Sequence, residues 1–113
     1  MQARAVPVQT ADLVIVNNHA DAIFRVEVIM PESDETVAAI DEERVQGLST
    51  RNFKGALVAR PGQEALLEFG AMHMGMWHFL GKIPLTIQPG KTFYILYEFD
   101  TARGRLGAQT MWR

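Results

Sequence analysis

The sequence predicts an all-β fold, a single antiparallel β-sandwich of seven or eight short strands. Apolar and polar residues alternate most clearly in Thr92–Phe99, where Phe93, Ile95 and Tyr97 share one face. Short strand-like segments recur along the chain, with turn residues between them at near-regular spacing. A chain of 113 residues with 48% hydrophobic residues can supply one core. We therefore expect one domain over residues 1–113.

Two strands are expected near the N-terminus. The apolar run Leu13–Val16 lacks alternation, which indicates a strand buried on both faces. Ala22–Met30 alternates, with every second residue apolar from Phe24 onward. Between them, Asn17–Asp21 offers turn residues, since Asn and Asp tolerate left-handed backbone and bond their own main chain. We expect these two strands to pair as the first hairpin.

Residues 32–47 are the least β-like part of the chain and hold six of its thirteen acidic residues. Ser33 or Asp34 could cap a short helix that ends before Gly47. The apolar stripe over this segment is thin. The pattern predicts a short helix or a long acidic loop.

The centre of the chain, Glu64–Phe79, predicts a β-hairpin. Gly70-Ala71 suits a two-residue turn whose first position needs a positive φ. This turn would pair Phe69 with Met72 and Leu67 with Met74, so that the methionines join the core. The predicted core is one cluster of inward residues from the alternating strands: Phe24, Val26, Val28, Leu67, Phe69, Met74, Phe93, Ile95 and Tyr97.

The opposite face of this hairpin is a candidate contact surface. Leu66, Trp77 and Phe79 point away from the predicted core, and His73 joins Glu64 and Glu68 in a polar rim. Large aromatic side chains left in water usually mark contact sites. Either residues 32–47 cover this surface within the chain, or a protein partner or a second copy covers it.

The strongest chemical alternative is a soft-metal site. Met72, Met74, Met76 and His78 lie at alternate positions, which would place all four on one strand face. Thioether and imidazole ligands suit Cu(I). Methionine also fills gaps in apolar cores, and the predicted pairing favours that role. The sequence thus favours no cofactor and weak or no copper binding.

Composition excludes several other classes. The net charge of −2 gives no nucleic-acid footprint, and no apolar run approaches the roughly 18 residues of a membrane helix. Cysteine is absent, which removes thiolate metal sites and cysteine nucleophiles. Ala3-Arg4-Ala5 fits the scar of a removed signal peptide, and residues 1–6 are expected to be disordered. These features lean towards an extracytoplasmic location.

Enzymatic activity finds little support in the sequence. Neither Ser33 nor Ser49 lies in a Gly-x-Ser-x-Gly turn. The carboxylates expected on outward strand positions could form a hydrolytic pair or join a carbohydrate site, and these are Glu27, Glu64, Glu68 and Glu98. A wetted sheet face accounts for them more simply.

The segment Pro89-Gly90-Lys91-Thr92-Phe93-Tyr94 resembles a run found in many bacterial immunoglobulin-like and envelope domains, and in some cupins. The His-x-His ligand motif of cupins is missing. The resemblance covers about ten residues and assigns no family. From the chain as a whole we expect an immunoglobulin-like sandwich that acts as a non-catalytic binding or assembly module of a bacterial envelope or secreted protein.

Overall fold

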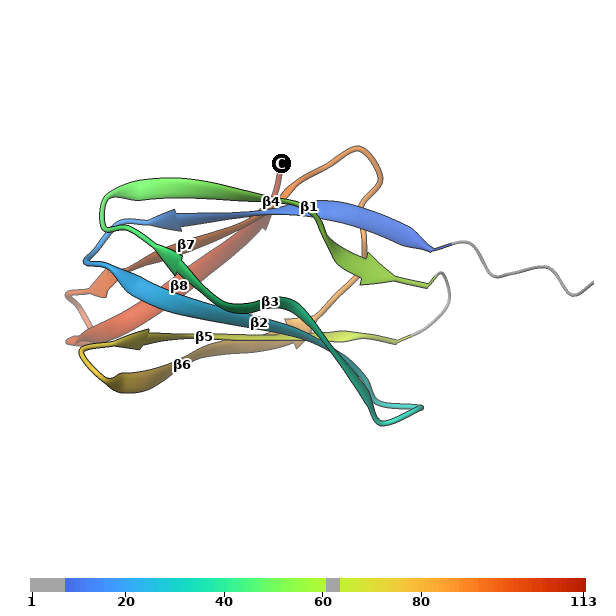
Figure 1. The fold of residues 1–113 in the computed structure, drawn as a ribbon, viewed down its shortest axis with the longest axis horizontal. Helices are drawn as coiled ribbons and strands as arrows, with labels where there is room; N and C mark the ends of the chain where they lie inside the picture. The colour runs from blue at the N-terminus through green and yellow to red at the C-terminus, as the bar shows by residue number, and fades with distance from the viewer. Residues whose placement is uncertain (1–7, 61–63) are drawn as a thin grey trace, which may run out of the picture.

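The protein is a β-sandwich, seen here in a computed structural model that describes residues 8–60 and 64–113. Two four-stranded sheets pack together, with strand orders β4-β1-β7-β8 and β3-β2-β5-β6 (Figure 1). Neighbouring strands are antiparallel except β1 and β7, which are parallel. The strands are β1 (Gln9–Asn17), β2 (Ala22–Met30), β3 (Glu35–Val45), β4 (Ser49–Ala59), β5 (Leu66–His73), β6 (Met76–Pro84), β7 (Phe93–Asp100) and β8 (Arg105–Trp112).

The all-β class and the sandwich are confirmed. The strand order departs from that of an immunoglobulin constant-type domain, whose first, second, fourth and fifth strands share a sheet. Here β2 and β5 lie in the sheet opposite β1 and β4. No helix among the described residues is long and apolar enough to cross a membrane. The expectations for residues 1–6 and for Ala3-Arg4-Ala5 lie outside the described residues.

The N-terminal strands are where expected, but their predicted pairing is wrong. β1 is a central strand between β4 and β7, which explains why Leu13 and Val14 are both buried. β2 belongs to the other sheet, so the turn crosses the sandwich. Asn17 holds that crossing, because its buried side-chain Nδ2 donates to the carbonyls of Ala20 at 2.8 Å and Val45 at 2.9 Å.

The acidic segment 32–47 is neither helix nor long loop, and that prediction is wrong. Residues 35–45 form the edge strand β3, paired with β2. An edge strand needs few apolar contacts, and here only Ile40 and Val45 are fully buried. Two register irregularities against β2 disturb the alternation, which hid the strand in the sequence.

The core lies between the inner faces of the two sheets. Eight of the nine predicted core residues are buried there, from Phe24 on β2 to Tyr97 on β7. The ninth, Met74, is 88% exposed, so its prediction is wrong. The turns β1–β2, β3–β4, β5–β6 and β7–β8 lie together at one end of the sandwich, which we call the loop end (Figure 1).

Candidate functional site

The β5–β6 hairpin turns at Met74-Gly75 and not at Gly70-Ala71. His73 pairs with Met76, and both turn residues have positive φ, 52° and 74°, as a type I′ turn requires. Gly70 serves packing instead of turning, because a Cβ at this position would collide with the Trp77 ring. Ala71 is fully buried and pairs with His78. β5 therefore continues beyond Gly70 to His73, and Met72, Met74 and Met76 lie outside the core.

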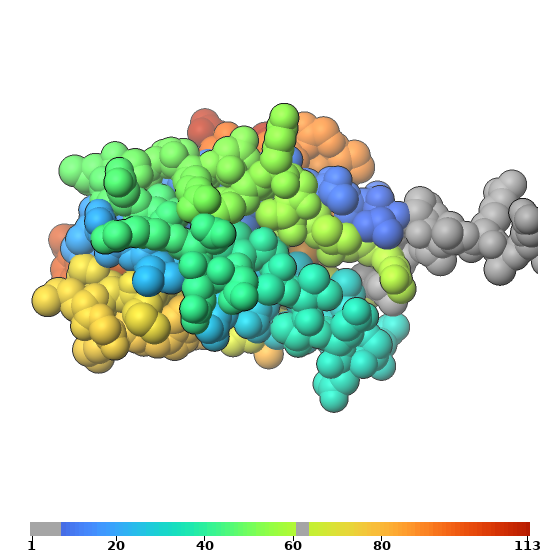
Figure 2. Space-filling model, in the orientation of Figure 1, coloured from blue at the N-terminus to red at the C-terminus, as the bar shows by residue number. Residues whose placement is uncertain are grey.

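Apolar side chains gather on the outer face and the turn of this hairpin. Trp77 is 46% exposed and Phe79 59%, while Met76 is 65% exposed. Met72 lies between Trp77 and Ile23 in the strand register, so all three share the outer face. Figure 2 shows the turn segment, in yellow, forming a corner of the loop end. We call this surface the hairpin patch, and its residues are Ile23, Met72, Met74, Met76, Trp77 and Phe79.

Charged groups border the hairpin patch. The Arg25 guanidinium lies 5.5 Å from the centre of the Trp77 ring and pairs with Glu42 at 2.7 Å. Asp21 pairs with Arg44 at 3.1 Å, beside a hollow of about 330 Å³ that Met72 and Met74 also line. A guanidinium over an aromatic face is attracted by the ring quadrupole. The patch is therefore an apolar surface with a polar rim.

The structure does not bring together all the residues predicted for the contact surface. Trp77 and Phe79 are together, but Leu66 pairs with Pro84, six residues along β5 from Met72. That separation is about 20 Å at 3.3 Å per residue. Leu66 therefore lies apart from the patch. β3 does not cover this surface either, because β2 and β5 lie between it and β6, and both Trp77 and Phe79 remain exposed.

The polar rim predicted from Glu64, Glu68 and His73 is likewise divided. Glu68 stands between Glu27 and Lys82 in the register, and not opposite His73. His73 is at the loop end, where its Nδ1 lies 3.3 Å from the Asp21 carbonyl oxygen. Arg25, Asp21 and Arg44 border the patch in place of the expected rim, and periodicity within one hairpin could not have revealed them.

All three histidines of the chain gather at the loop end. The ring centres of His19 and His73 are 5.2 Å apart, and those of His73 and His78 are 6.5 Å apart. His19 also lies against Tyr97 and Phe99. Among the described residues, no three His, Asp or Glu side chains are arranged to hold a metal ion. A metal site here would need the methionine sulfurs.

The four predicted copper ligands do not share one strand face. Met72 lies opposite Trp77 on the outer face, Met74 is in the turn, and His78 lies opposite the buried Ala71. The predicted burial of these methionines, which disfavoured copper binding, is wrong. Met74 and Met76 are open to solvent; Met74 follows His73 in the chain, and Met76 pairs with His73 across the hairpin.

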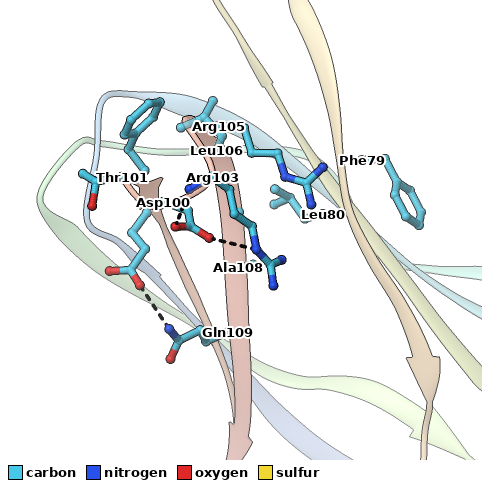
Figure 3. A pocket seen from close by; sticks show the side chains of 12 residues that line it. Phe79, Leu80, Asp100, Thr101, Arg103, Arg105, Leu106, Ala108 and Gln109 are labelled. Carbon is cyan, nitrogen blue, oxygen red and sulfur yellow. Dashed lines mark hydrogen bonds and ion pairs between the residues drawn. The ribbon is translucent and has the colours of Figure 1, made fainter.

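A groove of about 860 Å³ opens between the edge strands β6 and β8 (Figure 3). Phe79 and Leu80 form one wall, and Leu106 and Ala108 contribute to the other. Arg103 and Arg105 extend into the space between these walls (Figure 3). The groove is a second opening at the side of the sandwich, next to the hairpin patch.

The carboxylates in and around this groove already have partners. Asp100 Oδ1 accepts from the backbone N–H groups of Ala102 at 3.0 Å and Arg103 at 3.2 Å. Glu98 accepts a hydrogen bond from the Gln109 side chain at 3.4 Å. It lies on β7, whereas Glu27 and Glu68 lie on the other sheet. The outward carboxylates thus divide between two sheets, and only Glu27 and Glu68 are direct neighbours.

Searches for similar proteins gave no match to this chain, whether among protein-family models, curated proteins or solved structures.

Proposed function

We propose that this chain is a non-catalytic binding module that holds a protein partner through the hairpin patch. The observation that carries the proposal is the joint exposure of Trp77 and Phe79 beside three methionines at the end of one hairpin. Tryptophan is among the residues that dominate binding energy when a partner covers them. Methionine adapts its shape to different apolar surfaces. The patch therefore combines a rigid anchor with adaptable surroundings.

The borders of the patch support the same function. The rim residues Arg25 and Arg44 are each paired with an acid at the surface, and none of the patch residues carries a charge. An apolar centre with a polar rim is the usual organisation of a protein interface. A location in a bacterial envelope or a secreted protein is part of the proposal and depends on the sequence alone.

Site-specific photocrosslinking in the producing cells tests this function. A photoreactive residue in place of Met76 should form a defined crosslinked product, and the Trp77→Ala change should abolish it. The matched control places the same residue at Val58, which is 37% exposed on β4 of the other sheet. Crosslinking of equal extent at both sites, or products that persist without Trp77, would disprove a specific patch. Circular dichroism of Trp77→Ala establishes that the variant is folded.

A second function, Cu(I) binding, is favoured by the exposure of Met74 and Met76 beside His73, whose ring lies near those of His19 and His78. Thioether sulfur is a soft ligand that selects Cu(I). Titration of the purified protein against a Cu(I) chelator should show one-to-one binding that disappears in a Met74→Ala, Met76→Ala double variant. Equal affinity in the wild type and the double variant would exclude this site.

A further inference from the structure

The four edge strands of the sandwich differ in how well they are protected against pairing with another strand. Proteins protect such edges with bulges, charges and proline, because an open edge presents unpaired N–H and C=O groups. β3 has two register irregularities and three consecutive acids, Asp41, Glu42 and Glu43. β4 has an irregularity against β1, where Gly55 takes a positive φ. β6 has a bulge at Leu80 and ends at Pro84.

β8 has none of these protections over most of its length. Its register with β7 is unbroken from Arg105 to Trp112. Residues 106–112 contain neither a charge nor a proline. Only Arg105, at the start of the strand, is charged. β8 is thus the open edge of its sheet.

The hydrogen bonds at the end of β8 show which of its backbone groups are free. Thr92 and Arg113 exchange both N–H···O bonds, at 2.8 and 2.9 Å. Hydrogen-bonded pairs alternate along an antiparallel ladder. The odd-numbered residues of β8 therefore bond to β7, and the even-numbered ones direct their N–H and C=O groups outward. The outward set is Leu106, Ala108, Thr110 and Trp112.

From this geometry we infer that β8 pairs antiparallel with β8 of a second copy of the chain, about a twofold axis at Ala108. The even-numbered residues of β8, whose backbone groups point outward, must face even-numbered residues of the second copy. In every allowed register, the residue numbers of two facing residues therefore add up to an even number. The register centred on Ala108 joins Leu106 to Thr110 of the second copy. It also places Arg105 opposite Met111, which avoids like charges.

The neighbouring register, centred on Gln109, is less favourable than the one centred on Ala108. An axis at Gln109 would place Arg105 opposite Arg113, and like charges directly opposite each other are destabilising. With the axis at Ala108, this alanine, the smallest residue of the outward set, faces Ala108 of the second copy. Such a dimer joins two four-stranded sheets into one of eight strands. The pairing uses the backbone of β8, so it does not depend on the proposed binding function.

The association state of purified full-length protein gives the first test. The wild type should sediment at twice its 12.7 kDa mass, with dissociation on dilution. Ala108→Pro removes one outward N–H but no bond to β7, so this variant should be a folded monomer. Ala108→Ser keeps the N–H and should remain dimeric. A wild type that stays monomeric at the highest attainable concentration would overturn the inference.

The absence of cysteine allows a second test that does not depend on the proline variant. In the Ala108 register, the two copies of residue 108 form a hydrogen-bonded pair with Cα atoms about 5.5 Å apart. That spacing lies within the range of a disulfide. Ala108→Cys should oxidise to a covalent dimer, whereas Val58→Cys on the opposite edge strand β4 should not. Equal crosslinking of the two variants, or no crosslinking of Ala108→Cys, would disprove the β8 interface.

Discussion

The β5–β6 and β7–β8 hairpins occupy equivalent edge positions, one in each sheet, yet their turns are built differently. β7 and β8 keep one register over all their pairs, and Asp100 bonds the backbone of their turn. β5 and β6 shift register at Leu80 and turn through Met74-Gly75, which exposes apolar side chains. The β7–β8 hairpin ends in polar groups that satisfy one another. The β5–β6 hairpin presents apolar surface that the fold itself does not use.

The largest expected effect contrasts two residues of the β5–β6 hairpin. Phe69 is buried in the core, and its replacement by Ala should lower the free energy of unfolding by about 3–5 kcal/mol. Met74 is exposed, and Met74→Ala should change stability by less than about 0.5 kcal/mol. Urea unfolding of both variants measures the difference. A comparable loss at Met74 would indicate that the hairpin turns at Gly70 and that the methionines are buried.

The two glycines of the same hairpin should respond differently to alanine. A Cβ at Gly70 meets the Trp77 ring and the His78 carbonyl, so Gly70→Ala should cost about 1–3 kcal/mol. Gly75 has open space around it, and Gly75→Ala should cost about 1–2 kcal/mol for its positive φ alone.

Trp77 fluorescence distinguishes the two causes. The collision at Gly70 should move the ring and change its emission, whereas Gly75→Ala should leave it unchanged. The Trp77→Phe background removes this signal and serves as the control, since Trp112 remains. Unchanged emission in Gly70→Ala would mean that the ring does not rest on Gly70.

The contrast between the hairpins also explains what the sequence could predict. In β7 the alternation of Phe93, Ile95 and Tyr97 defines one face. The polar residues after Asp100 are the one turn candidate between β7 and β8. The segment 64–79 contains two glycines that suit a turn, and sequence alone gave no reason to choose Gly75. The choice depends on the Trp77 ring, which needs a residue without a side chain beneath it. This contact joins neighbouring strands, and periodicity does not report it.

The candidate site depended on the same choice. The sequence left open whether Trp77 and Phe79 are covered, and the structure leaves both partly exposed, whereas the predicted burial of Met74 followed from the wrong turn. The prediction for the acidic segment 32–47 was wrong for a related reason, since an exposed edge strand has few apolar residues in its sequence. Local patterns thus located the inner faces of both sheets. Pairing across the chain decided which residues reach the loop end.

The turn of β7–β8 should show a smaller effect than either glycine. Asp100→Ala removes the acceptor of two backbone N–H groups at the surface and should cost about 1 kcal/mol. Asp100→Asn keeps a side-chain oxygen and should retain most of that stability. Thermal unfolding compares the two variants. Equal loss in both would indicate that the charge, and its contact with Arg103 at 3.6 Å, matters more than the hydrogen bonds.

The smallest effect at neutral pH is expected at Tyr97, the centre of β7. Its side chain is fully buried, and its hydroxyl has no hydrogen-bond partner among the described residues. Tyr97→Phe keeps the ring against Phe24 and should change stability by less than about 1 kcal/mol. A greater loss would reveal a partner for the hydroxyl.

Alkaline pH should enlarge the difference between the wild type and Tyr97→Phe. Burial raises the pKa of Tyr97 above its ordinary value of 10.0, because the charged phenolate is poorly solvated in the core. Above about pH 10 the unfolded chain releases the proton that the folded chain retains, so wild-type stability falls as pH rises. Tyr97→Phe lacks this proton and should lose less stability between pH 7 and about pH 11. Identical pH dependence of unfolding in the two proteins would show that Tyr97 ionises as readily in the folded chain as in the unfolded one.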